Sequence, residues 1–397
     1  MRRLHGVAGV AALALAMTAC GGEDDAPGER DAIVQMLNES RVLEAEAAAI
    51  EYRLIERCLE DRGHTVHDPR EFMTWEPAEL TAVADEHPHA RSLPERDLAA
   101  EWGFGLWVYE EGADPDAWRE YEDAAWSSTP QDTWDEVDAA DFEALSPEDR
   151  YSWYVDFLGR DHARWLYGEY FGFEAPEENR PDDEDGAIVI EEDISEQPPP
   201  GGCRSAMIEA LYGEPHLVET EGGSADSVDG YVEWAYRPAV PLADVSSLYS
   251  VEAAIEQVQD LLVADFRQQV AAEEEDFLSC VADRGHGGWD FEDRGGLDLF
   301  DYWGQIYSGG DYPGGDGGSF PDPPSNLPSD FASLRELEIA MAVDLAECAD
   351  DSGLREAAET TWTEVNRDYY ESVETEMYSW QEEMRAVVEH GQELLDG

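Results

Sequence analysis

The sequence contains no lysine, and its 24 basic residues stand against 94 aspartates and glutamates. The formal net charge of −70 repels phosphate backbones and anionic lipid head groups, which argues against nucleic acid as a partner. A charge of this size is typical of a solvated surface, and the alternative interpretation is capture of cations or basic partners. Low apolar content would predict disorder, but 13 Trp, 17 Tyr and 12 Phe indicate packed cores.

Familiar nucleophile motifs are also missing. There is no Gly-x-Ser-x-Gly elbow, and a Ser-x-x-Lys dyad is impossible without lysine. With so many acids, a pair of carboxylates at any given spacing arises by chance, so the sequence cannot single out a glycosidase pair. We therefore predict a protein that is not an enzyme and that uses no cofactor. The alternative is a hydrolase directed at cell-wall glycan.

No apolar run is long enough to span a membrane, but the first twenty residues resemble an export signal. Two arginines precede a short apolar run over 7–17, and small residues then lead to Cys20. This pattern is typical of a lipoprotein signal peptide, here 1–19, cleaved before a cysteine that receives acyl chains such as palmitate. The alternative is an ordinary secretory signal that leaves Cys20 as an odd thiol. We expect an acidic tether over 20–40 and a lipid anchor at the outer face of the cytoplasmic membrane.

A short repeat organises the rest of the chain. "CLEDRGH" begins at Cys58 and "CVADRGH" begins at Cys280, so five of seven positions recur. An apolar stripe of helical spacing precedes each motif, and the glycine predicts the helix end. Aromatic and Gly/Pro-rich segments follow, and then a second helix with its own cysteine. We predict a mainly α fold of two related helical halves with long irregular loops, over 41–215 and 245–397, joined by a linker over 216–244.

Four cysteines besides Cys20 form an even set, which in an oxidising compartment predicts two disulfides. Four cysteines allow three connectivities, and the count alone does not choose among them. The repeat guides the choice, because each half then holds one bridge between its motif and its later helix. We expect Cys58 to pair with Cys203 and Cys280 with Cys348, each closing a long loop and contributing about 4 kcal/mol.

Apolar periodicity predicts the main helices, and Ser146 with Pro147 indicates the start of one of them. The stretch 287–328 is too rich in glycine and proline for regular structure. Strand-like alternation is confined to 228–236 and 188–190. The predicted helices are 42–62, 146–165, 254–280, 333–348 and a long terminal helix over 354–387.

Aromatic residues that follow each motif form the predicted binding surface. Side chains of this kind stack on sugar rings, so a cell-wall glycan is one expected partner and an envelope protein is another. The alternative is that these side chains form the cores of their own loops. The predicted binding residues are Trp102, Phe104, Trp107, Trp289, Trp303 and Tyr307.

Histidines gather just after the first motif, in "HTVH" and "HPH". Four imidazoles in so short a stretch are candidate ligands for a transition metal, and the alternative is exposed histidines in loops. A broken EF-hand pattern from Asp183 to Glu192 is a calcium candidate, although Pro181 occupies the first ligand position and the alternative is an acidic loop. Both features favour the alternative of a cation-binding envelope protein. The predicted metal ligands are His64, His67, His87 and His89.

The order of the motifs resembles a family of uncharacterised lipoproteins of high-GC Gram-positive bacteria. The resemblance covers residue 43 to the end and rests on two Cys-to-Gly helix ends, "WGFGLW", "ALSPEDRYSWYVDFLG", "GGC" and "AMAVDLAEC". In that family methionine follows the cysteine and an aromatic residue follows the glycine. Here Leu59 and Val281 replace the methionine, and His64 and His286 replace the aromatic residue. The resemblance implies that these histidines fill a packing position, and it implies no activity.

Overall fold

The computed structural model describes residues 30–84, 86–125, 137–167, 198–220, 231–242, 250–309 and 320–397. Within these ranges the fold is mainly α, as predicted, with twelve α-helices and one two-stranded sheet. Several predicted features lie outside the described residues: the signal peptide 1–19, Cys20, the strand at 188–190 and the calcium candidate between Asp183 and Glu192.

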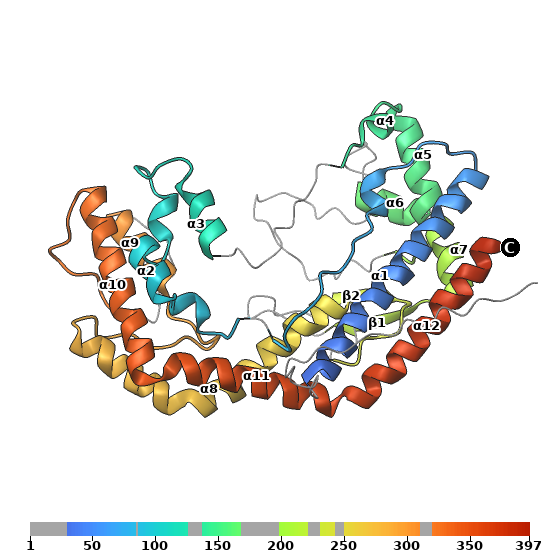
Figure 1. Cartoon of the computed structure of the whole chain (residues 1–397). Helices are drawn as coiled ribbons and strands as arrows, with labels where there is room; N and C mark the ends of the chain where they lie inside the picture. The colour runs from blue at the N-terminus through green and yellow to red at the C-terminus, as the bar shows by residue number, and fades with distance from the viewer. Residues whose placement is uncertain are drawn as a thin grey trace, which may run out of the picture.

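Four long helices form a curved base (Figure 1). Helices α1 (Arg30–Asp61) and α12 (Glu374–Asp396) lie side by side along one limb of the arc. Helices α8 (Val251–Asp283) and α11 (Leu354–Ser372) lie side by side along the other limb. The base therefore joins the first helix of the chain to the last one, and each limb carries its own group of shorter helices.

The shorter helices gather at the two ends of the arc (Figure 1). We call the group beside the C-terminal part of α1 the α1 end, and the group beside the C-terminal part of α8 the α8 end. The α1 end contains α4 (Ala140–Glu143), α5 (Pro147–Leu158), α6 (Arg160–Tyr167) and α7 (Gly202–Leu211). The α8 end contains α2 (Arg96–Trp102), the 3-10 helix η3 (Leu106–Tyr109), α3 (Ala117–Ala125), α9 (Leu299–Tyr307) and α10 (Phe331–Ser352).

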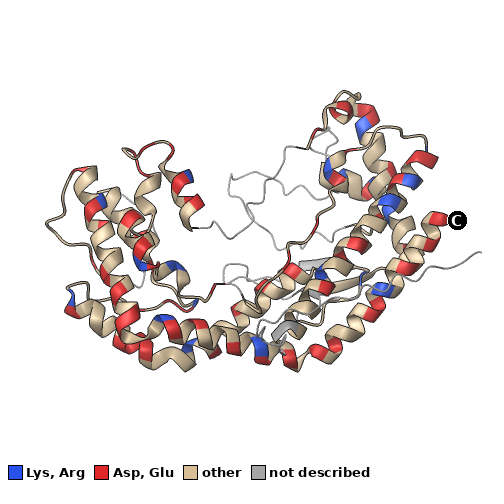
Figure 2. Ribbon diagram, in the orientation of Figure 1, with Lys and Arg blue, Asp and Glu red and all other residues tan. Residues whose placement is uncertain are grey.

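Acidic residues are spread over the whole arc (Figure 2). Aspartates and glutamates occur along both limbs and at both ends, and the fewer arginines are scattered among them (Figure 2). The excess of negative charge therefore belongs to the surface as a whole and is not gathered on one element.

The start of α5 follows the predicted pattern. The Ser146 hydroxyl accepts a hydrogen bond from the Asp149 N–H at 3.1 Å, and Pro147 occupies the first turn. The prediction of one helix reaching Trp165 is wrong, because Gly159, with φ of 88°, ends α5 and separates it from α6. A left-handed φ is available to glycine and breaks the helical hydrogen-bond pattern.

Other helix boundaries also differ from the expected ones. Helix α1 begins at Arg30 rather than at residue 42, and Met36 and Leu37 are 1% and 0% exposed. The part of the expected tether from residue 30 onward therefore belongs to the core. The expected terminal helix is two helices, because Val373, with φ of −108° and ψ of 5°, interrupts it between α11 and α12.

The stretch 287–328 contains helix α9, which the composition did not predict. Asp298 caps the helix by accepting from the Asp301 N–H at 3.2 Å, and four apolar side chains of the helix are buried. The small sheet pairs β1 (His216–Thr220) with β2 (Tyr231–Ala235) in antiparallel fashion. Strand β2 falls in the expected strand range 228–236, whereas β1 was not predicted; both lie in the expected linker 216–244.

Both disulfides form with the predicted pairing, Cys58 to Cys203 and Cys280 to Cys348, with Cα–Cα distances of 5.7 and 5.6 Å. Two large apolar clusters surround them. One fills the α1 end, and the other follows α8, α10, α11 and the first turns of α1. Because residues from 93 to 104 also pack into this second cluster, the packing of the two predicted halves is interleaved, and their division stays a prediction.

Candidate functional site

Helices α1 and α8 end in the same backbone motif. Gly63 and Gly285 have φ values of 98° and 97°, in the left-handed region that glycine favours. The N–H groups of His64 and His286 reach back to carbonyl groups of the last helical turn, at 3.1 and 3.0 Å. These are the bonds of a Schellman cap. The repeated "RGH" therefore encodes the same helix end twice.

At the α1 end, the motif holds one carboxylate of α5. Arg62 Nη1 lies 2.8 Å from Asp156 Oδ1, and His64 Nε2 lies 2.9 Å from Asp156 Oδ2. Both oxygens of the aspartate are thus engaged by residues of one turn. The neighbouring Cys58 is bonded to Cys203, so the cysteine of the motif is not a thiolate nucleophile or a metal ligand in this state.

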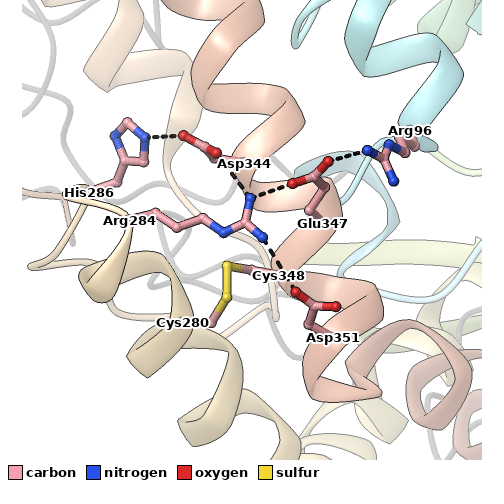
Figure 3. Close-up of polar contacts among 8 residues, drawn as sticks. All are labelled: Arg96, Cys280, Arg284, His286, Asp344, Glu347, Cys348 and Asp351. Atoms are coloured by element: carbon pink, nitrogen blue, oxygen red, sulfur yellow. Dashed lines mark hydrogen bonds and ion pairs between the residues drawn. A yellow bond between two sulfur atoms is a disulfide. The ribbon is translucent and has the colours of Figure 1, made fainter.

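The α8 end repeats the arrangement with more partners (Figure 3). Arg284 Nη1 lies 3.0 Å from Asp344 Oδ1, and His286 Nε2 lies 2.9 Å from Asp344 Oδ2. Arg284 also contacts Glu347 at 2.5 Å and Asp351 at 3.3 Å. These three acids all belong to α10, so one arginine binds two successive turns of that helix. We call each arginine and histidine pair, with the aspartate that it holds, a clamp.

The electrostatics of the two clamps agree. Burial alone would raise the pKa of Asp156, but hydrogen bonds from His64 and Arg62 outweigh it and hold the pKa below its ordinary value. Burial and hydrogen bonds from His286 and Arg284 have the same opposed effects on the pKa of Asp344, with the same result. Both aspartates are therefore ionised partners of a helix cap, and the histidines bind them rather than only filling space.

The structure does not bring the four predicted metal ligands together. His64 contacts Asp156, and Trp153 Nε1 donates to His67 Nδ1 at 3.2 Å. His87 and His89 lie elsewhere, in the apolar cluster along α8. The reason is that the chain leaves the α1 end after Phe72, which still packs on Trp153, and runs to the other limb before reaching His87. Among the described residues, no group of three His, Cys, Asp or Glu side chains is arranged to hold a metal ion.

The second pair of histidines, His87 and His89, is buried and packed against the protein. His89 Nε2 lies 3.0 Å from Glu274 Oε1, and its ring packs on Phe266 and Phe291. Burial, together with the neighbouring His89, lowers the pKa of His87 to about 4. These two side chains are parts of a core.

The predicted binding aromatics do gather, all at the α8 end, but as buried side chains. Trp102 and Trp107 are stacked with their ring centroids 5.7 Å apart. Trp303 lies 5.8 Å from Tyr307, and Trp289 packs on Tyr302. Five of the six predicted residues are less than 10% exposed and Tyr307 is half-buried. Their ring faces therefore contact the protein and do not form open platforms for sugars. The buried five are Trp102, Phe104, Trp107, Trp289 and Trp303.

A buried carboxylate organises this aromatic cluster. Glu338 of α10 is 0% exposed and accepts from the N–H groups of Phe104 and Leu106, at 3.1 and 3.0 Å. Its second oxygen accepts from the Tyr307 hydroxyl at 2.6 Å. Burial raises its pKa to about 7 even though these hydrogen bonds act in the opposite direction. Glycines allow the close approach, because a Cβ on Gly103 would lie 3.1 Å from Glu338 Oε1.

Beside this cluster lies a half-open pocket of about 340 Å³, which we call the cavity, between α2, α3 and the first turns of α10. Its apolar walls come from Trp102, Trp107 and Phe331. Its polar walls combine Arg335 with three carboxylates. The guanidinium of Arg335 lies over the Trp107 ring, 3.8 Å from the centroid. The acids are Glu101, Asp114 and Glu120.

Arg335 and Glu338 were not predicted from the sequence. One signal for Glu338 was present, because it interrupts the apolar stripe of α10 between Leu334 and Met341 at helical spacing. A carboxylate on the buried face of a helix needs partners, so its position alone indicates a built polar site. No sequence pattern of this kind marks Arg335, because its environment depends on η3, which carries Trp107.

Comparison with known protein families, with curated proteins and with solved structures finds no match to this chain. None of the described helices is long and apolar enough to cross a membrane. The candidate site therefore rests on its own geometry.

Proposed function

We propose that this chain is a membrane-anchored extracytoplasmic lipoprotein that binds a small molecule and catalyses no reaction. The apolar run over 7–17 followed by Cys20 supports a lipid anchor. The two disulfides support an oxidising compartment, because such bonds persist mainly outside the cytoplasm. The proposed location is the outer face of the cytoplasmic membrane, and the resemblance to envelope lipoproteins agrees with it.

The cavity at the α8 end is the observation that carries the binding proposal. Its volume of about 340 Å³ lies in the range of small-molecule sites. It combines buried aromatic walls with one guanidinium and several carboxylates, whereas the two clamps at the helix ends are saturated by their own residues. The cavity is therefore the place where a ligand finds polar groups and apolar surface together.

Two features favour binding over hydrolysis of cell-wall glycan. A glycoside hydrolase needs two carboxyl groups at the substrate, one of them able to donate a proton. Glu338 has the raised pKa of such an acid, but it is fully buried and both of its oxygens accept hydrogen bonds. The predicted aromatic platforms are packed as well, so a glycan would meet only the rim of the cavity.

The binding proposal is tested by filling the cavity. Ala113 lines it, and Ala332 is exposed on α10 outside its lining, so Ala113→Trp and the control Ala332→Trp form a matched pair. We expect thermal unfolding of the wild type and of Ala332→Trp to shift upward, saturably, with at least one of three probes: L-phenylalanine, choline and diacetylchitobiose. Ala113→Trp should lose that shift. A shift that persists in Ala113→Trp, or no shift with any probe, would contradict the cavity as the binding site.

The anchoring proposal has its own test. Cells that express the full chain with labelled palmitate should incorporate label into the wild type and not into Cys20→Ala. Label on both proteins, or on neither, would contradict a lipid at Cys20.

A further inference from the structure

Arg335 is the basic residue in the lining of the cavity, and it forms no ion pair with the residues that the structure describes. Its guanidinium stacks on Trp107, and its buried Nε has no hydrogen-bond partner among the residues that the structure describes. Arg284 and Arg355, by contrast, lie 3.0 and 2.8 Å from carboxylate oxygens of α10. An arginine that packs on a ring keeps the donors at its edge for a planar anion. In a chain with a net charge of −70, most neighbouring charges are negative, so an arginine without an ion pair in a cavity is unusual.

The acids of the cavity supply the opposite charge. Glu101 lies on α2, Asp114 on the loop before α3, and Glu120 on α3, and all three side chains are exposed. Three separate segments thus each contribute an acidic residue to the lining of one space that also holds Arg335. Their oxygens accept hydrogen bonds from an ammonium group, and the half-buried Phe331 ring offers apolar contact.

We infer that this cavity binds a small zwitterion with an apolar side chain, that is, a free α-amino acid. Arg335 receives the carboxylate, the acids receive the ammonium, and the Phe331 ring contacts the side chain. This inference rests on the proposed function, since it names the ligand of the same cavity. A zwitterion is also compatible with the negative electrostatic field of the protein. Because it has no net charge, it approaches the acidic surface without the repulsion that a net anion meets.

Other ligand classes fit the cavity less well. A simple cation would place a positive charge near Arg335, and a simple anion would lie among three carboxylates. A neutral sugar would shield both kinds of charge from water without neutralising either of them. Only a ligand that carries both charges satisfies both sets of groups.

A matched set of ligands tests the inference by calorimetric titration of the purified chain. Free L-phenylalanine and L-leucine should bind. N-acetyl-L-phenylalanine lacks the ammonium and L-phenylalanine amide lacks the carboxylate, so each should bind at least about tenfold more weakly than L-phenylalanine, since a charged partner is left unpaired.

Two variants divide the contacts. Arg335→Gln should weaken L-phenylalanine at least about tenfold and leave the amide unchanged, whereas Arg119→Gln, on exposed α3 outside the cavity lining, should change neither. Glu101→Gln combined with Glu120→Gln should weaken L-phenylalanine and leave the N-acetyl compound unchanged. Circular dichroism melts identify a variant that does not fold, and in that event Arg335→Lys replaces it, with the same expected loss of a bidentate contact.

The outcomes separate the ligand class from the site. If a blocked compound binds as tightly as L-phenylalanine and Ala113→Trp abolishes both, the zwitterion is wrong and the cavity remains the binding site. If only diacetylchitobiose or choline binds, and Ala113→Trp abolishes that binding, the zwitterion is likewise wrong and the cavity remains the binding site. If no probe shows binding that depends on Ala113, the inference and the proposed function are both wrong.

Discussion

The α1 end and the α8 end use one helix cap to hold two differently built partners. At the α1 end the captured aspartate and the bridged cysteine, Asp156 and Cys203, lie on separate helices, α5 and α7. At the α8 end Asp344 and Cys348 lie one turn apart on the single helix α10. The same cap therefore binds an acid and a cysteine about one helical turn apart in space. The two residues need not belong to one continuous helix.

Glycines let the start of α7 approach the end of α5 closely. The Gly201 N–H donates to the Leu158 carbonyl at 2.8 Å, so α7 begins where α5 ends. The backbone of Gly202, with φ of 60°, lies so close to the last turn of α5 that a Cβ would overlap the Asp156 carbonyl. Only glycine permits this approach, so α5 and α7 meet at the helix cap although they are separate in the chain.

The ends differ again in their buried acids. At the α1 limb Glu51 is 2% exposed and accepts from Arg237 at 2.8 and 2.7 Å and from Tyr212 at 2.6 Å. Glu338, at the α8 end, is held by backbone N–H groups and the Tyr307 hydroxyl. The helix caps and disulfides, which occur at both ends, thus have a structural role. Among the described residues, the features that suggest binding occur only at the α8 end.

The largest effects should come from removing each disulfide. The Cys58–Cys203 bridge spans 145 residues and the Cys280–Cys348 bridge spans 68. Chain entropy predicts that the double serine variants lose about 5 and about 4 kcal/mol of unfolding free energy, respectively. Denaturant unfolding of both variants under identical conditions measures the order. A larger loss for the shorter loop would mean that contacts at the α8 end, and not loop length, set the contribution of the bridge.

The buried acid Glu338 should give the α8 end a pH dependence of its own. The pKa of Glu338 is raised from its ordinary 4.5 to about 7, chiefly by burial. Between these values the unfolded chain releases the proton while the folded chain keeps it, so the contribution of this group to stability is full below pH 4.5 and is lost as the pH rises to 7. The loss is roughly 3 kcal/mol.

Glu338→Gln isolates this effect from the repulsion among the many other acids. The difference in unfolding free energy between wild type and Glu338→Gln should change steadily between pH 4.5 and 7 and level off above it. The exposed neighbour Glu336→Gln is the control and should track the wild type. A difference that stays constant with pH would show that Glu338 ionises in the folded chain as it does in the unfolded one.

Much of the architecture could be predicted because it is local or repeated. Helical periodicity predicted α1, α8, α10 and α11, and the repeat predicted the disulfide pairing. The wrong helix boundaries have local causes that amino-acid composition does not reveal. Asp298 caps a helix inside a glycine-rich stretch, and Val373 breaks a continuous apolar stripe without a glycine or proline to mark it.

The candidate site was harder to predict because it depends on how distant segments meet. Sequence proximity suggested that His64 and His87 converge, but the chain crosses to the other limb between them. The aromatic residues were found, yet their burial depends on α10 lying against the "WGFGLW" segment. The guanidinium of Arg335 is positioned by the Trp107 ring, which lies more than two hundred residues earlier in the chain. Such contacts carry no periodic signal.

The smallest effects should distinguish the clamps. At the α1 end Arg62 and His64 share the single carboxylate Asp156, whereas at the α8 end Glu347 and Asp351 also contact Arg284. Asp156→Asn should therefore cost about 1 to 2 kcal/mol, and Asp344→Asn about 0.5 kcal/mol, because Arg284 keeps charged partners.

The pH dependence of these two variants follows from the lowered pKa values. Hydrogen bonds outweigh burial and hold the pKa of both Asp156 and Asp344 below 3.8, so the clamps contribute stability above that pH and lose it as the pH falls through the folded-state values. Urea unfolding at pH 7 should separate the two variants, and the separation should shrink in acid. Equal losses at pH 7 would mean that Glu347 and Asp351 do not replace Asp344. The wider network at the α8 end would then contribute no more than the single pair at the α1 end, and the two caps would be equivalent in energy as well as in backbone form.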